Sequence, residues 1–234
     1  MRFVAARSME NQAAPMHHKV REMLISQRTQ LLNGLRGHLV EIGVITVQGP
    51  RRARELAYRV EADGETIPPA VCEALAPLVV QLRNLDEAIA HCDRTITQMA
   101  KKDERARRLM SIPGVGLVTA SAMAASVQGI SSFAGPREFA AFLGLTSKQN
   151  SSGGKQRLGR ISKMGNRYLR KLLVVGAHAA LFHCKPYTDA LRTWTKKLIE
   201  EKPFNLVAVA LTNKMARIAF AILRSKTNYR EILV

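Results

Sequence analysis

The sequence predicts an all-α protein made of a long helical coiled-coil segment followed by a compact helical domain with a helix-hairpin-helix-like turn. Apolar residues recur at helical spacing through most of the 234 residues. No stretch shows the convincing alternation of apolar and polar residues that marks a half-buried strand. Because 47% of the residues are hydrophobic, we expect the chain to bury a core rather than stay disordered.

Two long helices are expected first. Apolar residues keep a roughly helical spacing from Pro15 and Met16 to Leu39, and the pattern stops near Gly43. The second helix begins after Ile67-Pro68-Pro69, because proline is tolerated in a first helical turn. Its apolar residues alternate steps of four and three over four heptads, which is the period of a coiled-coil seam. They are Val71, Leu75, Leu78, Leu82, Leu85, Ile89, Cys92, Ile96 and Met99. The seam suits a core helix packed against residues 16–39 of the same chain and, equally, a coiled coil between two chains.

A change in composition marks the expected domain boundary. After the basic link 101–108 the elements become short and rich in glycine and alanine, so we divide the chain into a helical linker and coiled-coil region, residues 1–108, and a second domain, residues 109–234. The second domain is expected to contain a helix, a tight turn and a helix at 109–128 and a short helix at 137–143. A polar glycine-rich loop at 144–164 follows, and then helices at about 166–183, 187–200 and 204–224.

The charge balance points to a polyanionic partner. There are 36 Lys and Arg residues against 18 Asp and Glu, a net charge of +18, which favours nucleic acid. Three widely spaced cysteines argue against a disulfide framework or a zinc ribbon. The longest apolar stretch, residues 172–182, is shorter than a membrane span. We therefore expect a cytoplasmic protein with no membrane segment and no metal site of its own.

The first candidate nucleic-acid-binding motif is Ile112-Pro113-Gly114-Val115-Gly116, which lies between two helical stretches. Gly114 and Gly116 permit a tight turn with uncovered amide groups, and the N-terminus of the next helix adds a partial positive charge. This pattern is typical of a helix-hairpin-helix, which contacts the DNA backbone without reading its sequence. A simple turn between two helices is the alternative.

The second candidate is the segment from Lys148 to Lys171, which contains eight cations and no carboxylate. Protein surfaces normally mix both signs of charge, so we expect phosphate groups to neutralise this segment. It includes Ser151-Ser152-Gly153-Gly154-Lys155. A serine beside glycines is open to a substrate, and the neighbouring cations could stabilise a phosphoryl-transfer transition state. The same composition suits a flexible linker, so the residue types leave both interpretations open.

Several of these stretches, taken together and in order, resemble the insertion-sequence transposases of the IS110/IS116/IS902 family. The matching segments are residues 111–116, 137–145, 151–155, 158–170 and 213–217, and residues 28–39 resemble the helix that precedes the coiled coil in those proteins. The resemblance implies a recombinase with two cooperating parts. One is an N-terminal RuvC-like domain with acidic metal ligands, and the other is a C-terminal domain whose serine attacks a DNA phosphodiester. The resemblance also implies that a structured guide RNA directs the choice of DNA.

The resemblance also assigns roles to residues of this chain. It implies that Ser152 is the nucleophile, with Ser151 as the second choice, and that a set of cations contacts DNA or the guide RNA. This set consists of Lys155, Arg157, Arg160, Lys163, Arg167 and Arg170, and Gly114 and Gly116 join it as nucleic-acid-binding residues.

Residues 1–4 already resemble the sequence that follows the last catalytic acid of the RuvC-like domain, so a divalent metal such as Mg would belong to a domain outside this sequence. We therefore expect a truncated or partial DNA transposase that associates as a homo-oligomer through the heptad helix. The alternative is a non-catalytic nucleic-acid-binding remnant of such an enzyme.

Overall fold

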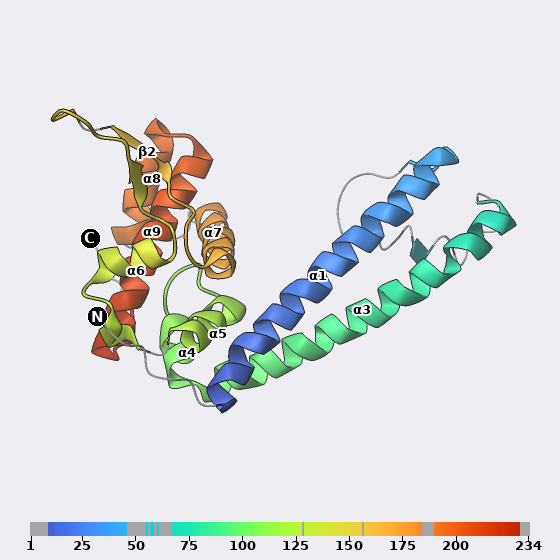
Figure 1. The fold of residues 1–234 in the computed structure, drawn as a ribbon, viewed down its shortest axis with the longest axis horizontal. Helices are drawn as coiled ribbons and strands as arrows, with labels where there is room; N and C mark the ends of the chain where they lie inside the picture. Colours follow the sequence, from blue (N-terminus) through green and yellow to red (C-terminus); the bar gives the residue numbers. More distant parts are fainter. Residues whose placement is uncertain are drawn as a thin grey trace. The chain divides into compact units, whose positions relative to one another are not determined.

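The described residues are mostly helical, as the sequence predicted (Figure 1). A computed structural model describes residues 9–45, 55, 57–58, 60, 67–127, 129–155, 157–183 and 190–229. Apart from the 3-10 turn η1 (Ile130–Ser132), the helices are α1 (Met9–Glu41), α3 (Pro69–Lys102), α4 (Glu104–Leu109), α5 (Leu117–Ser126), α6 (Pro136–Phe142), α7 (Arg167–Phe182), α8 (Ala190–Glu201) and α9 (Phe204–Ser225). Two short strands, β1 (Ser147–Gln149) and β2 (Leu158–Ile161), form the one sheet among the described residues.

The contacts within the chain define two compact units. Residues 16–96 form a helical hairpin, and residues 97–229 form a globular unit to which residues 9–15 also belong. The units divide inside α3, between Ile96 and Thr97, whereas the sequence analysis placed the domain boundary after Arg108.

In the hairpin unit, α1 and α3 run antiparallel and side by side (Figure 1). Two ion pairs fix this direction. Arg21 of α1 pairs with Asp93 of α3. Two helical turns further along α1, Arg28 pairs with Asp86, which lies two turns before Asp93 in α3. The Arg28 Nη1 to Asp86 Oδ1 distance is 2.9 Å. A shared apolar cluster holds the helices together, with Leu32, Leu35 and Leu39 from α1 and Leu75, Val79 and Leu82 from α3.

The heptad seam therefore packs within the chain. Its members Leu75 and Leu82 contact the α1 cluster, and all seam residues are buried or half-buried. The 3.5-residue period allowed either packing within the chain or a coiled coil between two chains. In this unit, α3 packs against residues 16–39 of the same chain.

The globular unit is built around α9, which contacts α4, α6, α7 and α8. One face of α9 is fully buried, with Val207, Leu211 and Met215 in the core and Ala208, Ala216 and Ala219 where neighbouring helices approach closely. In length and composition α9 would also suit a membrane span, but half of its most apolar stretch is buried in this core, as is usual for the central helix of a globular protein.

The structure corrects the sequence analysis in one segment. Residues 144–164 were expected to form a loop without strands, and instead β1 and β2 pair there as an antiparallel ribbon. The strands lack an apolar–polar alternation because both faces are almost wholly exposed, so no buried face selects hydrophobic residues. The start expected for α8, at residue 187, lies outside the described residues.

The buried His18 makes the stability of the helical hairpin depend on pH. Burial, with smaller contributions from Arg21 and His17, lowers the pKa of His18 from 6.5 to about 4. The folded chain keeps the ring neutral, while the unfolded chain takes up a proton near pH 6.5. Stability is therefore complete above pH 6.5 and falls toward pH 4 by roughly 1 kcal/mol per pH unit.

We expect the free energy of unfolding in urea to fall more between pH 7 and pH 4.5 for the wild type than for His18→Gln, which has no ring to protonate. Equal losses in the two proteins would contradict this explanation.

Candidate nucleic-acid interface

The β-ribbon presents the predicted serine at its tip. Beyond the paired strands, the Asn150 amide donates to the Arg157 carbonyl at 2.9 Å, and Ser152 and Lys155 form a further antiparallel bridge. Gly153 and Gly154 connect these two residues with φ of 58° and 76°. Positive φ at both central positions is the requirement of the two-residue hairpin turn that matches strand twist, and glycine meets it without strain. The Ser-Gly-Gly-Lys sequence is thus a formed hairpin turn.

The two serines of the ribbon differ in their hydrogen bonding. The Ser151 hydroxyl oxygen accepts a hydrogen bond from the Arg157 amide at 3.1 Å, which ties it to the opposite strand. The exposed Ser152 hydroxyl has no such bond within the described part of the chain. The geometry therefore favours Ser152 over Ser151 as the group available to a substrate.

The cations predicted to bind nucleic acid take two different positions. Lys155, Arg157, Arg160 and Lys163 are exposed on the ribbon, and none of them forms an ion pair with another described residue. Arg167, the first residue of α7, is also exposed. Arg170 is half-buried instead.

Arg170 and Asn213 fix the base of the ribbon to the helices behind it. The Arg170 guanidinium donates to the Leu143 carbonyl at 2.9 Å, and the Asn213 side-chain amide donates to the Leu145 carbonyl at 3.0 Å. Asn213 lies on α9, so the chain that leads into β1 is held by both α7 and α9. The ribbon is exposed, but its base is anchored.

The turn at 112–116 has the signature of a type II turn. Pro113 and Gly114 occupy the central positions, Gly114 has φ of 82°, and the Val115 amide donates to the Ile112 carbonyl at 3.0 Å. A Cβ on Gly114 would lie 2.5 Å from the carbonyl oxygen of Gly176 in α7, so Gly114 serves close packing of the backbone.

Gly116 has the opposite surroundings. It is exposed at the N-cap of α5, where no side chain caps the helix and a Cβ would meet nothing within 4 Å. The first amide groups of α5 are the part of this turn that a phosphate could reach. Arg170 and Gly176 are six residues apart in α7, so the ribbon base and the turn meet this helix at points separated by about 9 Å.

The cations before this turn are partly neutralised. Asp103 caps α4, and its side chain accepts hydrogen bonds from the Arg105 amide at 2.8 Å and from the Arg105 guanidinium at 2.9 Å. Burial would raise the pKa of Asp103, but these bonds outweigh it and the pKa lies below its usual value. Arg108 pairs with Glu104. Lys101, Lys102 and Arg107 are the exposed cations of this cluster.

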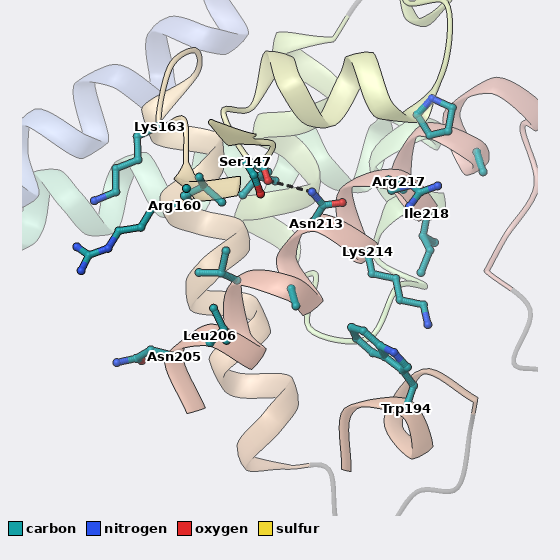
Figure 2. A pocket seen from close by; sticks show the side chains of 17 residues that line it. Ser147, Arg160, Lys163, Trp194, Asn205, Leu206, Asn213, Lys214, Arg217 and Ile218 are labelled. Carbon is teal, nitrogen blue, oxygen red and sulfur yellow. Dashed lines mark hydrogen bonds between the residues drawn. The ribbon is translucent and has the colours of Figure 1, made fainter. Parts of the chain in front are cut away.

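Sequence analysis missed a pocket of about 1090 Å³ beside the ribbon (Figure 2). Its walls come from β2 and the residues around the ribbon, from Trp194 of α8 and from the outer face of α9. Arg160 and Lys163 belong to it, and so do Lys214 and Arg217, whose motif was noted without a role. Lys214 and Arg217 are three residues apart, which places both on one face of α9. This spacing is the signal in the sequence that could have indicated a shared binding surface.

The described residues do not fit a metal site. No group of three or more His, Cys, Asp or Glu side chains gathers anywhere in the part of the chain that the structure covers. A magnesium site needs carboxylate or other oxygen ligands, and the ribbon and the pocket contain no carboxylate.

Comparison with known proteins identifies the family of this chain. Residues 106–192 match the family described as Transposase IS116/IS110/IS902. The chain is 42% identical over 232 residues to a protein of Pseudomonas aeruginosa described as a probable family 20 transposase. The alignment covers 98% of this chain and 69% of that protein. The chain belongs to the IS116/IS110/IS902 transposase family. The family match begins within α4 and continues through α7, so it includes both candidate motifs.

Alignments with other relatives of this transposase are similarly long. The chain is 40% identical to the transposase for insertion sequence element IS1111A of Coxiella burnetii and 33% identical to the transposase for element IS1328 of Yersinia enterocolitica. These matches cover 98% and 95% of this chain but 64% and 66% of the relatives. The chain thus spans about two thirds of the length of its relatives, and the activity of the whole protein is a matter for proposal.

Salt dependence tests the role of the ribbon cations in DNA binding. Replacing Arg157 or Arg160 by Ala should lower the magnitude of the slope of log K against log salt by about one for each phosphate that the variant no longer neutralises. The slope is measured from fluorescence-anisotropy titrations of duplex DNA at a series of salt concentrations.

Arg108→Ala is the matched control, because its charge is already paired with Glu104. We expect its slope to equal that of the wild type. A wild-type slope in both ribbon variants would show that the ribbon cations are only solvated.

The two glycines of the 112–116 turn should respond differently to alanine. Gly114→Ala combines a positive φ with a clash against the α7 backbone, so we expect a decrease of about 2 kcal/mol or more in the free energy of unfolding. Gly116→Ala should leave stability nearly unchanged, because its φ of −80° and open surroundings accept a methyl group. Denaturation in urea measures both, and equal stability of the two variants would overturn the packing role of Gly114.

Proposed function

We propose that this transposase chain binds DNA along the basic β-ribbon and supplies Ser152 as the nucleophile for strand cleavage and transfer. The observation that carries the proposal is the position of Ser152. Its hydroxyl is exposed at the tip of a formed hairpin whose cations have no carboxylate partner among the described residues.

The reaction is an exchange of one phosphate ester for another. The Ser152 oxygen forms a bond to the phosphorus atom and loses its proton to solvent, while the bond from phosphorus to the leaving sugar oxygen breaks and that oxygen takes up a proton. The product is a phosphoserine link to one DNA strand, from which a DNA hydroxyl can later displace the serine. No net ester bond is consumed, so the step needs no external energy source.

The ribbon cations support this chemistry through charge. A pentacoordinate phosphoryl group spreads negative charge over its equatorial oxygens, and prepositioned cations stabilise that charge. Lys155 is bridged to Ser152 through the backbone, and Arg157 lies opposite Ser151 on the ribbon. Both cations thus accompany the serine whenever the ribbon contacts DNA.

The wider binding surface is also part of the proposal. The uncapped N-terminus of α5 at Gly116 would hold a second backbone phosphate, in the manner of a helix-hairpin-helix. A structured guide RNA would share the exposed cations, including Arg167. We propose the cytoplasm as the compartment of this activity.

A homo-oligomer through the heptad helix remains a proposal. Because the seam of α3 is covered by α1 in the same chain, such an oligomer would have to exchange α1 between two chains or use other residues of α3. The non-catalytic alternative, a nucleic-acid-binding remnant, rests on the absence of a carboxylate cluster from the described residues.

A covalent-adduct assay separates these functions. The full chain, alone and supplemented with a RuvC-like acidic domain, is incubated with labelled insertion-sequence DNA and examined for protein linked to DNA under denaturing conditions. Removal of a nucleophile typically costs about a thousandfold or more in rate, so we expect Ser152→Ala to abolish the adduct.

Ser151→Ala is the matched control and should keep the adduct, since Ser151 serves the backbone of the ribbon. Equal adduct from wild type and Ser152→Ala would remove Ser152 from the mechanism. No adduct from any protein, with DNA binding intact, would favour the remnant.

A further inference from the structure

The pocket beside the ribbon combines two kinds of surface that a simple phosphate-binding face does not need. Its interior is apolar, with Leu206, Val209 and Ala210 of α9 and Ile161 of β2, whereas Arg160, Lys163, Lys214 and Arg217 bring four cations to the same site. None of the described lining residues is Asp or Glu. An apolar interior with cations and no acid fits a ligand that has both a flat apolar part and a negative charge.

An aromatic ring completes this surface. Half-buried Trp194 lines the pocket from α8, and the Lys214 ammonium lies over its ring at 4.2 Å from the centroid (Figure 2). Indole is the aromatic ring that interacts best with cations, and aromatic rings also stack on nucleobases. A phosphate that draws the Lys214 ammonium away would leave this ring face open to a base.

We propose that the pocket receives an unpaired nucleotide of the DNA strand that Ser152 attacks, with its base against Trp194 and the apolar residues of α9 and its phosphates on the four cations. The inference rests on the proposed function, because it concerns the strand held by the same ribbon. The volume of about 1090 Å³ is at the upper end for small-ligand sites and accommodates a nucleotide.

The connection to the ribbon identifies the strand. β2 contributes Arg160 and Ile161 to the pocket wall, and the same ribbon carries Ser152 at its tip. A DNA strand that follows the ribbon cations away from the attacked phosphate is led toward the pocket. Strand transfer requires bases near the cut to leave their partners, and a site for one unpaired base would stabilise that open state.

Duplex DNA does not account for the pocket. In a duplex the base faces are stacked on one another, and the protein contacts phosphates, sugars and groove edges. Such contacts would use the four cations and leave the apolar interior and Trp194 without a role.

The chain contains a single tryptophan, so its emission reports directly on this pocket. The test uses the full chain with Ser152→Ala, so that no cleavage occurs, and titrates it with single-stranded DNA of about six nucleotides, the same sequence as duplex DNA, and as single-stranded RNA. We expect the single-stranded DNA to quench the Trp194 emission and the duplex to bind without quenching it.

Two comparisons test whether a base enters the pocket. Ala210→Phe, which fills the interior without removing a charge, should weaken single-stranded DNA binding by about tenfold, the equivalent of one stacked base, and leave duplex binding unchanged. The second comparison uses a series of single-stranded oligonucleotides, each lacking the base at a different position. With the Ser152→Ala chain, we expect one of them to bind about tenfold more weakly than the intact strand. This comparison needs no pocket variant.

Two substitutions in α9 separate pocket charge from general charge. Lys214→Met should weaken single-stranded DNA binding more than Arg224→Met, which removes an equal charge from the same helix outside the pocket lining.

Equal quenching by duplex DNA, equal affinity for every abasic oligonucleotide, or quenching by RNA and not by DNA would each overturn the proposal. These readouts do not depend on cleavage. Failure of the Ser152 adduct with quenching intact would refute the proposed nucleophile alone, and the reverse result would refute the pocket alone.

Discussion

The two faces of α9 organise the globular unit. One face buries Val207, Leu211 and Met215 with several alanines, so that α4, α6, α7 and α8 all pack on a single helix. The opposite face carries Asn213, Lys214 and Arg217 and forms a wall of the pocket. Because the buried face fixes the rotation of the helix, it also fixes where these polar side chains lie. Packing in the core therefore determines the geometry of the pocket wall.

An exposed two-stranded ribbon is only marginally stable by itself, and this one has no buried face. Its position depends on its base, where Arg170 and Asn213 donate hydrogen bonds to the Leu143 and Leu145 carbonyls. The turn of Gly153 and Gly154 fixes the other end. Between these two points, side chains can be devoted to a ligand, which explains how a cluster of cations without acids is tolerated.

The residues of the family motifs thus divide into two kinds. Gly114 and Arg170 serve the fold, through close packing against α7 and a hydrogen bond to a carbonyl. Ser152 and the ribbon cations are exposed and make no ion pairs with other described residues. For a transposase that spans about two thirds of the length of its relatives, this division separates the residues that hold the domain together from those that are exposed to a ligand.

The sequence by itself determined the helices, because their apolar periodicity is local and survives without knowledge of the partners. The 3.5-residue period of α3 and the acid-free segment around Ser152 could be read directly. The tertiary structure decided the rest. It paired the α3 seam with α1, it formed the ribbon that has no alternation to reveal it, and it distinguished Ser152 from Ser151 by a hydrogen bond to Arg157. It also brought Trp194, Lys214 and Arg160 to one pocket. The α3 seam and the pocket depend on contacts between residues distant in the chain, and the exposed ribbon depends on backbone pairing, so no local apolar periodicity encodes them.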